Sequence, residues 1–176
     1  MGNGFFVDSG LVLTNKHIIE REKGDFIVVR TSDNEYLIGH EVKEYKDLAL
    51  VKIGKKTSFL YLNNKFNKKE SVHIVSYFNN NYLDQDGNVL DIKRTKWDKY
   101  EYKKTLALSN YATFGYSGSP LLNDNGEVIG IVSAVTQLNM PLLDKKISVF
   151  FNSYAISTDD IINFLQRWLI LIKVLL

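Results

Sequence analysis

Short apolar or alternating runs, each bounded by turn-forming residues, recur along most of this chain and restrict its fold class. Runs of this length and period are typical of β-strands, whereas helices need longer runs with a period near 3.6 residues. The runs lie at 4–7, 11–14, 26–30, 36–44, 48–53, 72–78, 89–93, 105–109, 120–122, 128–136 and 147–154. A tight hairpin turn is indicated at Asp124-Asn125-Gly126. The sequence therefore predicts an all-β protein.

The pattern becomes helical only at Thr158. Thr158 is suited to cap a helix, and two aspartates follow where the helix dipole favours negative charge. Apolar residues then recur at helical spacing as far as Leu169, and the tail beyond is apolar apart from Lys173. The 16 residues of 161–176 contain Arg167 and are short for a membrane span. We expect this helix to pack on the domain or to contact a partner or an additional domain, with membrane docking as the alternative.

A polar, lysine-rich segment at 63–70 separates two groups of strand runs. Such a segment is typical of a connection between lobes. The 176 residues suffice for one domain, or for two small lobes that share a cleft. We predict a first lobe at 1–65, a second at 66–157 and a C-terminal helix at 158–176, together forming one domain. The polar stretch 79–104 is expected to form hairpins or surface loops of the second lobe.

Several classes of chemistry are disfavoured by composition. The chain has no cysteine, which excludes disulfides, thiolate metal sites and cysteine nucleophiles. A net charge of +2 is too small to indicate a nucleic-acid partner. His17, His40 and His73 lack a second ligand at zinc spacing, and no glycine-rich phosphate loop opens a helix. We therefore expect no metal and no cofactor, with His40 and His73 as ordinary strand or surface residues.

The first residues, Met1 to Phe6, lack the basic region, apolar run and cleavage site of a signal peptide. A cytoplasmic location is the default expectation. Because strand-like sequence begins almost at once, we expect either that an upstream strand is missing or that the chain belongs to a longer protein.

Three short motifs carry candidate catalytic residues. Gly115 to Pro120 reads G-x-S-G-x-P, which places Ser117 on a tight turn with backbone amides nearby, as a nucleophilic serine requires. His17 directly follows the strand run 11–14 in Thr14-Asn15-Lys16-His17, and Asp47 begins a very apolar strand. Taken singly, each has a structural alternative: a polar turn, a strand-end histidine and a strand-start aspartate.

Together the motifs are more specific, because they occur in the order His, Asp, Ser that is typical of the chymotrypsin arrangement. Here the sequence resembles the trypsin-like peptidase family, especially compact bacterial members such as HtrA-like proteases and glutamyl endopeptidases. The matching runs are 2–6, 13–17, 47–53, 115–120 and 130–133. The resemblance covers most of residues 2–165, with 79–111 the least supported part.

The resemblance implies a fold of two six-stranded antiparallel β-barrels with the site between them and a C-terminal helix. It implies that Ser117 attacks a peptide carbonyl, that His17 moves the proton, and that Asp47 orients the imidazole. The amides of Gly115 and Ser117 would form the oxyanion hole, and Ser133 would hydrogen-bond Asp47. The substrate would be a polypeptide.

Substrate selectivity and activation are also suggested by the resemblance. None of the residues expected to line the specificity pocket is charged: Tyr111, Ala112, Phe114, Ser133, Ala134 and Val135. Val135 stands where the family usually has glycine, which narrows the pocket and favours small or medium apolar residues before the cut bond. Zymogen-type members carry an aspartate where this chain has Tyr116, so we expect no activating cleavage.

Two other functions stay open at this point. A trypsin-like fold that has lost hydrolysis would act as a protein-binding module, although all three triad residues are present. An esterase or transferase that uses the same serine would need a pocket for a non-peptide acyl group. Cleavage of denatured casein separates the peptidase from the binding module, and cleavage of small esters alone would favour the esterase.

Overall fold

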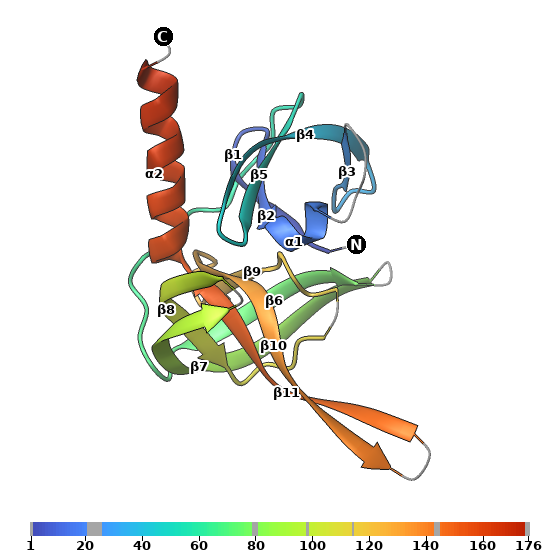
Figure 1. The fold of residues 1–176 in the computed structure, drawn as a ribbon. Coiled ribbons are helices and arrows are strands. Elements are labelled where there is room, and N and C mark those ends of the chain that lie inside the picture. Colours follow the sequence, from blue (N-terminus) through green and yellow to red (C-terminus); the bar gives the residue numbers. More distant parts are fainter. Residues whose placement is uncertain are drawn as a thin grey trace.

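The computed structural model describes residues 2–20, 26–78, 81–97, 99–113, 115–142 and 145–174. For 134–152 and 169–174 the description covers the backbone alone. The chain forms two β units, the first above the second in the view of Figure 1, and the C-terminal helix runs alongside the first. The all-β prediction with a C-terminal helix is confirmed.

The first unit is a five-stranded antiparallel sheet of order β1-β2-β5-β4-β3. Its strands are β1 (Gly4–Asp8), β2 (Leu11–Asn15), β3 (Ile27–Arg30), β4 (Tyr36–Tyr45) and β5 (Leu48–Ile53). Strand β2 pairs with β5 through the register Asn15↔Leu48. A single helical turn, α1 (Lys16–Ile19), follows β2 at once. Four residues are too few to produce a helical period, so the sequence pattern gave no indication of α1.

This first sheet has one strand fewer, in its described residues, than the six expected. The segment after β5 makes one backbone hydrogen bond to β1, from the Leu60 amide to the Phe6 carbonyl at 2.9 Å, but forms no strand there. Farther along, Asn63 donates to the Val128 carbonyl and Val128 donates to the Tyr61 carbonyl, both at 2.8 Å. The segment therefore crosses to the second unit and adds no strand to the first sheet.

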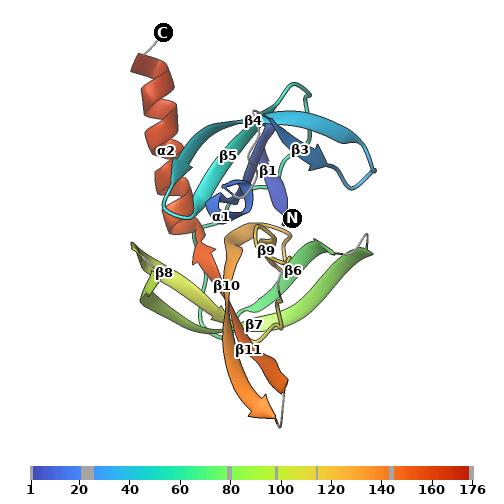
Figure 2. The ribbon, with the colours of Figure 1, turned by 45° about the vertical axis from the view of Figure 1, so that its right-hand side comes forward.

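The second unit is the expected six-stranded barrel, closed in the order β10-β11-β8-β7-β6-β9. Its strands are β6 (Ser71–Phe78), β7 (Asn81–Trp97), β8 (Tyr100–Leu108), β9 (Pro120–Asn123), β10 (Val128–Leu142) and β11 (Lys145–Ser157). The predicted hairpin region 79–104 contains β7, whose alternating exposure explains its polar sequence. The ends of β10 and β11 project from the barrel as a two-stranded ribbon (Figures 1 and 2).

Separate buried clusters fill the barrel and join the two units. One fills the barrel around Val72, Ile74, Leu121 and Ile129. The other joins the first sheet to the barrel and the C-terminal helix, with members Phe5, Leu11, Leu13, Leu48, Leu50, Tyr102, Val128, Ile131, Ile156, Ile161 and Phe164. Since a fully buried large apolar side chain contributes about 1.5–3 kcal/mol, this shared cluster fixes the two units relative to each other.

Helix α2 (Thr158–Val174) closes one side of that cluster through Ile161 and Phe164. The Thr158 hydroxyl donates to the Asn63 carbonyl at 2.7 Å and to the Ile129 carbonyl at 3.2 Å. Thr158 thus ties the helix to the barrel by donating hydrogen bonds. Contact with a partner through the apolar end of α2 stays a prediction, since those side chains lie outside the description.

No helix in the described part of the chain combines the length and apolar character that a membrane span requires.

Candidate active site

His17 and Asp47 are paired where the first sheet meets the barrel. His17 Nδ1 lies 2.8 Å from Asp47 Oδ1 and 2.9 Å from Asp47 Oδ2. The register Asn15↔Leu48 explains this proximity, because it sets the end of β2 beside the start of β5. The carboxylate accepts at Nδ1, so Nδ1 carries the proton and Nε2 is left as a base.

The backbone around this pair is fixed by further bonds. The His17 amide donates to Asp47 Oδ1 at 3.1 Å. The Asp47 carbonyl accepts both the Lys16 amide and the Asn15 side-chain amide, each at 3.1 Å. The turn that carries Asp47 is therefore bound at three points to the end of β2 and the start of α1, and the imidazole is held in one orientation.

The carboxylate of Asp47 has a second side-chain partner from the barrel. The Ser133 hydroxyl donates to Asp47 Oδ2 at 2.5 Å, which is the contact expected from the family resemblance. On its backbone side, the Asp47 amide donates to the Tyr102 hydroxyl at 3.1 Å. Tyr102 is fully buried, and burial raises its pKa well above the usual range, so its hydroxyl stays neutral.

Ser117 lies in the connection between β8 and β9, on a tight turn flanked by two glycines with positive φ, Gly115 at 103° and Gly118 at 86°. The Gly118 amide donates to the Val132 carbonyl at 2.9 Å, which anchors the turn to β10. A Cβ added at Gly118 would lie 1.9 Å from the Asn3 carbonyl oxygen. Glycine is therefore required at 118 both for its φ and for its close approach.

The Ser117 turn lies next to the segment that carries His17. A Cβ added at Gly2 would be 2.5 Å from Ile18 Cδ1 and 3.1 Å from the Ser117 carbonyl oxygen. Gly2 thus lies between the Ile18 side chain of α1 and the backbone of Ser117. Among the residues described, no hydrogen bond joins the Ser117 hydroxyl to the His17 ring. Such bonds are often long in unliganded sites and shorten when substrate binds.

Two backbone amides at the turn are unused. Within the described ranges, the amides of Gly115 and Ser117 donate to no protein acceptor. Those of Tyr116 and Ser119, in the same turn, donate to the Thr113 and Tyr116 carbonyls at 3.2 and 3.0 Å. Free amides beside a nucleophilic hydroxyl are what an oxyanion hole needs.

The residues predicted to line the specificity pocket are differently placed. Ala112 is 2% exposed and packs in the barrel core, whereas Tyr111 is 69% exposed. Ser133 faces Asp47, and Ala134 and Val135 follow it on β10, opposite Tyr154 and Ser153 of β11. Phe114 lies outside the described residues. The composition of the pocket therefore stays a prediction.

Tyr116, the residue before the serine, anchors the turn in the barrel. Its side chain is 5% exposed, and its ring lies 5.9 Å from that of Phe78. Its hydroxyl accepts a hydrogen bond from Gln85 Nε2 at 3.1 Å. The turn therefore has an anchor within the barrel at the position where zymogen-type members carry an aspartate.

Asn3 and Tyr102 also contact the site, although the sequence reasoning did not single them out. Asn3 stands between two glycines in the run 2–6, which resembles the trypsin-like family, so the sequence does offer an indication that this position matters. Tyr102 lies in a lysine-rich stretch with nothing to distinguish it from its neighbours.

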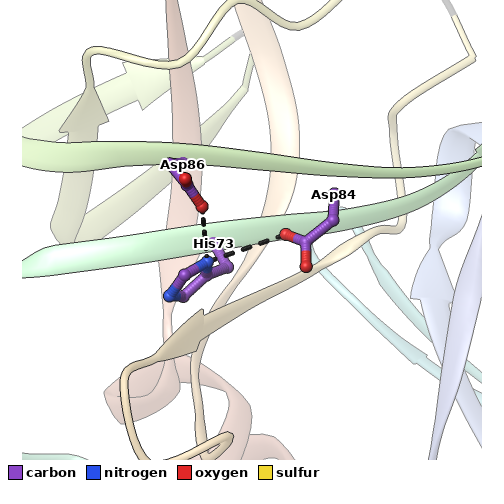
Figure 3. A group of neighbouring side chains, drawn as sticks. All are labelled: His73, Asp84 and Asp86. Atoms are coloured by element: carbon purple, nitrogen blue, oxygen red, sulfur yellow. Dashed lines mark ion pairs between the residues drawn. The ribbon is translucent and has the colours of Figure 1, made fainter.

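His73, expected to be an ordinary residue, belongs to a carboxylate cluster on the outer face of the barrel (Figure 3). Its Nδ1 lies 2.8 Å from Asp86 Oδ1 and 3.7 Å from Asp84 Oδ1, and its Nε2 lies 3.3 Å from Asp124 Oδ1. Burial lowers the pKa of His73, but the Asp124 hydrogen bond and the charges of Asp84 and Asp86 raise it overall. A protonated imidazole satisfies these carboxylates, so an ion-pair cluster explains the arrangement.

Comparison with known proteins gave a family and several structural neighbours. The profile described as "Trypsin-like peptidase domain" matches residues 2–131. Serine protease HTRA1A of Danio rerio is 27% identical over 181 residues, covering 94% of this chain and 34% of the relative. The mitochondrial serine protease HTRA2 of Drosophila virilis is also 27% identical, over 94% of this chain and 39% of its own length. The chain thus spans about a third of the curated relatives that it matches.

Among solved structures, the inactive form of the Rv3671c protease from M. tuberculosis aligns with a TM-score of 0.77 at 15% identity. The alignment covers 94% of this chain and 82% of that protein. The HtrA-type protease AlgW with a decapeptide aligns with a TM-score of 0.74 at 21% identity, over 90% of this chain and 48% of that protein. At these identities the likeness establishes a shared fold.

Proposed function

Because this chain belongs to the trypsin-like peptidase family, a family of hydrolases, we propose that it is a serine endopeptidase with His17, Asp47 and Ser117 as its triad. The pairing of His17 Nδ1 with Asp47 at 2.8 Å, beside a serine turn with two unused amides, is the observation that carries the proposal. This pairing leaves His17 Nε2 free to act as the base. The two unused amides can donate hydrogen bonds to the oxyanion.

In the proposed reaction the Ser117 hydroxyl oxygen attacks the scissile carbonyl carbon while its proton passes to His17 Nε2. The carbonyl oxygen becomes an oxyanion that accepts hydrogen bonds from the Gly115 and Ser117 amides. The intermediate then expels the amine, which takes the proton from His17, and an ester to Ser117 remains. Water then attacks the ester carbonyl while His17 takes a proton from it; the Ser117 oxygen leaves, takes that proton back from His17, and the carboxylic acid is released.

Asp47 acts on the imidazole without accepting its proton. Its Oδ1 accepts the His17 amide at 3.1 Å, and its Oδ2 accepts the Ser133 hydroxyl at 2.5 Å. These donors fix the position of the carboxylate, whose negative charge stabilises the imidazolium that forms during attack.

We propose a polypeptide substrate, bound as an added strand on β10. The pairing of β10 with β9 ends at Ile131↔Pro120, and the backbone of Val132 is bonded to Gly118 and Ser119, so the edge of β10 that an added strand could use begins beyond Val132. An extended peptide gains main-chain hydrogen bonds at such an edge. AlgW, which shares this fold, was solved with a decapeptide. The predicted pocket residues at 111, 112, 114 and 133–135 are uncharged, and Val135 would narrow the pocket, so we expect small or medium apolar residues before the cut bond.

We also propose that no activating cleavage is required, because Tyr116 fixes the serine turn from within the barrel. Activity of the chain with an intact N-terminus, checked by mass spectrometry, supports this. Activity that arises only after trimming would contradict it.

A fluorescent fluorophosphonate tests the function directly, because it reacts with activated serines. The wild type should be labelled, whereas Ser117→Ala and His17→Ala should not be. Ser119→Ala is the matched control, since that hydroxyl is buried two residues away and has no hydrogen-bond partner among the described residues, so labelling should persist. A folded wild type that is not labelled but still binds peptide would favour a binding module. Hydrolysis of small esters without any peptide would favour the esterase alternative.

A further inference from the structure

Asn3 contacts both lobes and the serine turn at once. Its side-chain Nδ2 donates to the Gly115 carbonyl at 2.7 Å and to the Ser76 hydroxyl at 3.2 Å. Its Oδ1 accepts the Tyr77 amide at 2.8 Å. Its own amide donates to the Ser117 carbonyl at 2.8 Å, so two carbonyls of the serine turn are bound by one residue.

These two carbonyls belong to the peptide planes on either side of the plane that carries the Ser117 amide. In the peptide plane between residues 115 and 116, the Gly115 carbonyl accepts a hydrogen bond from Asn3, and the Tyr116 amide donates to the Thr113 carbonyl. In the peptide plane between residues 117 and 118, the Ser117 carbonyl accepts a hydrogen bond from the Asn3 amide, and the Gly118 amide donates to the Val132 carbonyl. Because each peptide unit is planar, fixing both ends of both planes sets the direction of the Ser117 amide between them.

We propose that Asn3 is a positioning residue that holds the Ser117 turn in the conformation in which the Ser117 amide donates to the oxyanion. This inference rests on the proposed function. Asn3 touches no reacting atom and acts only through the backbone of the turn. Its position is itself fixed, because its carbonyl accepts the Thr14 hydroxyl at 2.6 Å.

A side-chain amide suits this task because it supplies two donors and an acceptor in one plane. The carboxylate of Asn3→Asp has nearly the same shape but no donor, and it would place negative charge beside the Gly115 carbonyl. Asn3→Ala removes the side-chain contacts while keeping the backbone bond to Ser117. The matched control is Ser76→Ala, which removes one Asn3 partner and leaves the bond to Gly115.

The test compares kcat and KM of these variants on a peptide substrate chosen from a library, with the active fraction measured by fluorophosphonate titration. Loss of an oxyanion donor lowers kcat by about 100- to 1000-fold, so a displaced donor should lower it by about 10- to 100-fold. We expect that decrease per active molecule in Asn3→Asp and Asn3→Ala, with KM within about threefold of the wild type. Ser76→Ala should keep kcat within about threefold. Folded Asn3 variants with wild-type kcat, or a loss seen only in KM, would overturn the proposal.

Amide hydrogen exchange separates this inference from the proposed function. If Asn3 holds the turn, the Tyr116 and Gly118 amides should exchange at least about tenfold faster in Asn3→Asp than in Ser76→Ala. Equal exchange in the two variants would overturn the positioning role. An inactive wild type whose turn loosens in Asn3→Asp would leave the positioning role supported and refute the peptidase proposal.

Discussion

Lys46 and Asp160 form an ion pair 2.7 Å long that joins the turn carrying Asp47 to the first turn of α2. The pair is largely buried, with side-chain exposures of 15% and 6%. Lys46 Nζ also lies 4.8 Å from the centre of the Tyr102 ring, whose hydroxyl accepts the Asp47 amide. Asp47 is thus held from the first sheet, the barrel and the helix together.

Removing one member of this pair should destabilise the fold. Breaking a buried pair leaves an uncompensated charge and costs about 3–5 kcal/mol, whereas replacing both members is often nearly neutral. We expect Lys46→Met and Asp160→Asn each to lower the free energy of unfolding in urea by about 3 kcal/mol, and the double variant to lose less than their sum.

Lys104 and Asp159 provide the control for that experiment, because they pair at 2.8 Å in the same turn of α2 but are 50% and 31% exposed. Lys104→Met should cost less than about 1 kcal/mol. If Lys46→Met costs no more than Lys104→Met, the pair does not hold α2 to the Asp47 turn.

Ser133→Ala tests the contribution of the barrel to the orientation of Asp47. It removes the 2.5 Å hydrogen bond to Asp47 Oδ2 and changes no charge. A tenfold decrease in kcat corresponds to about 1.4 kcal/mol, which lies near the lower end of the values for hydrogen bonds to charged groups. We expect kcat to fall about tenfold with KM nearly unchanged. Ser133→Thr keeps the hydroxyl and should retain most activity; equal losses in both variants would indicate a packing effect.

Gly118→Ala should abolish fluorophosphonate labelling and destabilise the protein, because the new Cβ would lie 1.9 Å from the Asn3 carbonyl oxygen. Gly126→Ala is matched in backbone strain, with φ of 75° against 86°, but its Cβ would meet no atom within 4 Å. Gly126→Ala should cost about 1–2 kcal/mol and keep labelling. Similar losses of unfolding free energy in the two variants would show that the serine turn can move away from Asn3.

The sequence predicts the strands, the helix and the candidate triad residues because each has a local pattern around it. Asp47 begins an apolar run, His17 follows one, and Ser117 is framed by glycines. The partners of the residues that support the site are not given by any local pattern, since Asn3 reaches Gly115 and Lys46 reaches Asp160 across more than 100 residues. Contacts of that kind follow from the packing of the lobes. The absence of a sixth strand from the described part of the first sheet is another example. The segment after β5 forms hydrogen bonds with Val128 of the barrel, and no local sequence pattern indicates this.

The His73 cluster should make stability depend on pH without affecting catalysis. Because the pKa of His73 is raised above its ordinary value of 6.5, the folded protein binds this proton more tightly than the unfolded chain does. The resulting stabilisation is fully present below about pH 6.5 and is lost as the pH rises through the folded pKa. Wild type should therefore exceed His73→Gln in unfolding free energy at pH 5.5, by less than about 1 kcal/mol because the carboxylates are exposed, and should lose this advantage at alkaline pH. Asp124→Asn removes one of the groups that raise the pKa of His73, so this variant should lose the stabilisation at a lower pH than the wild type. A pH-independent difference in unfolding free energy between wild type and His73→Gln would refute the ion-pair interpretation.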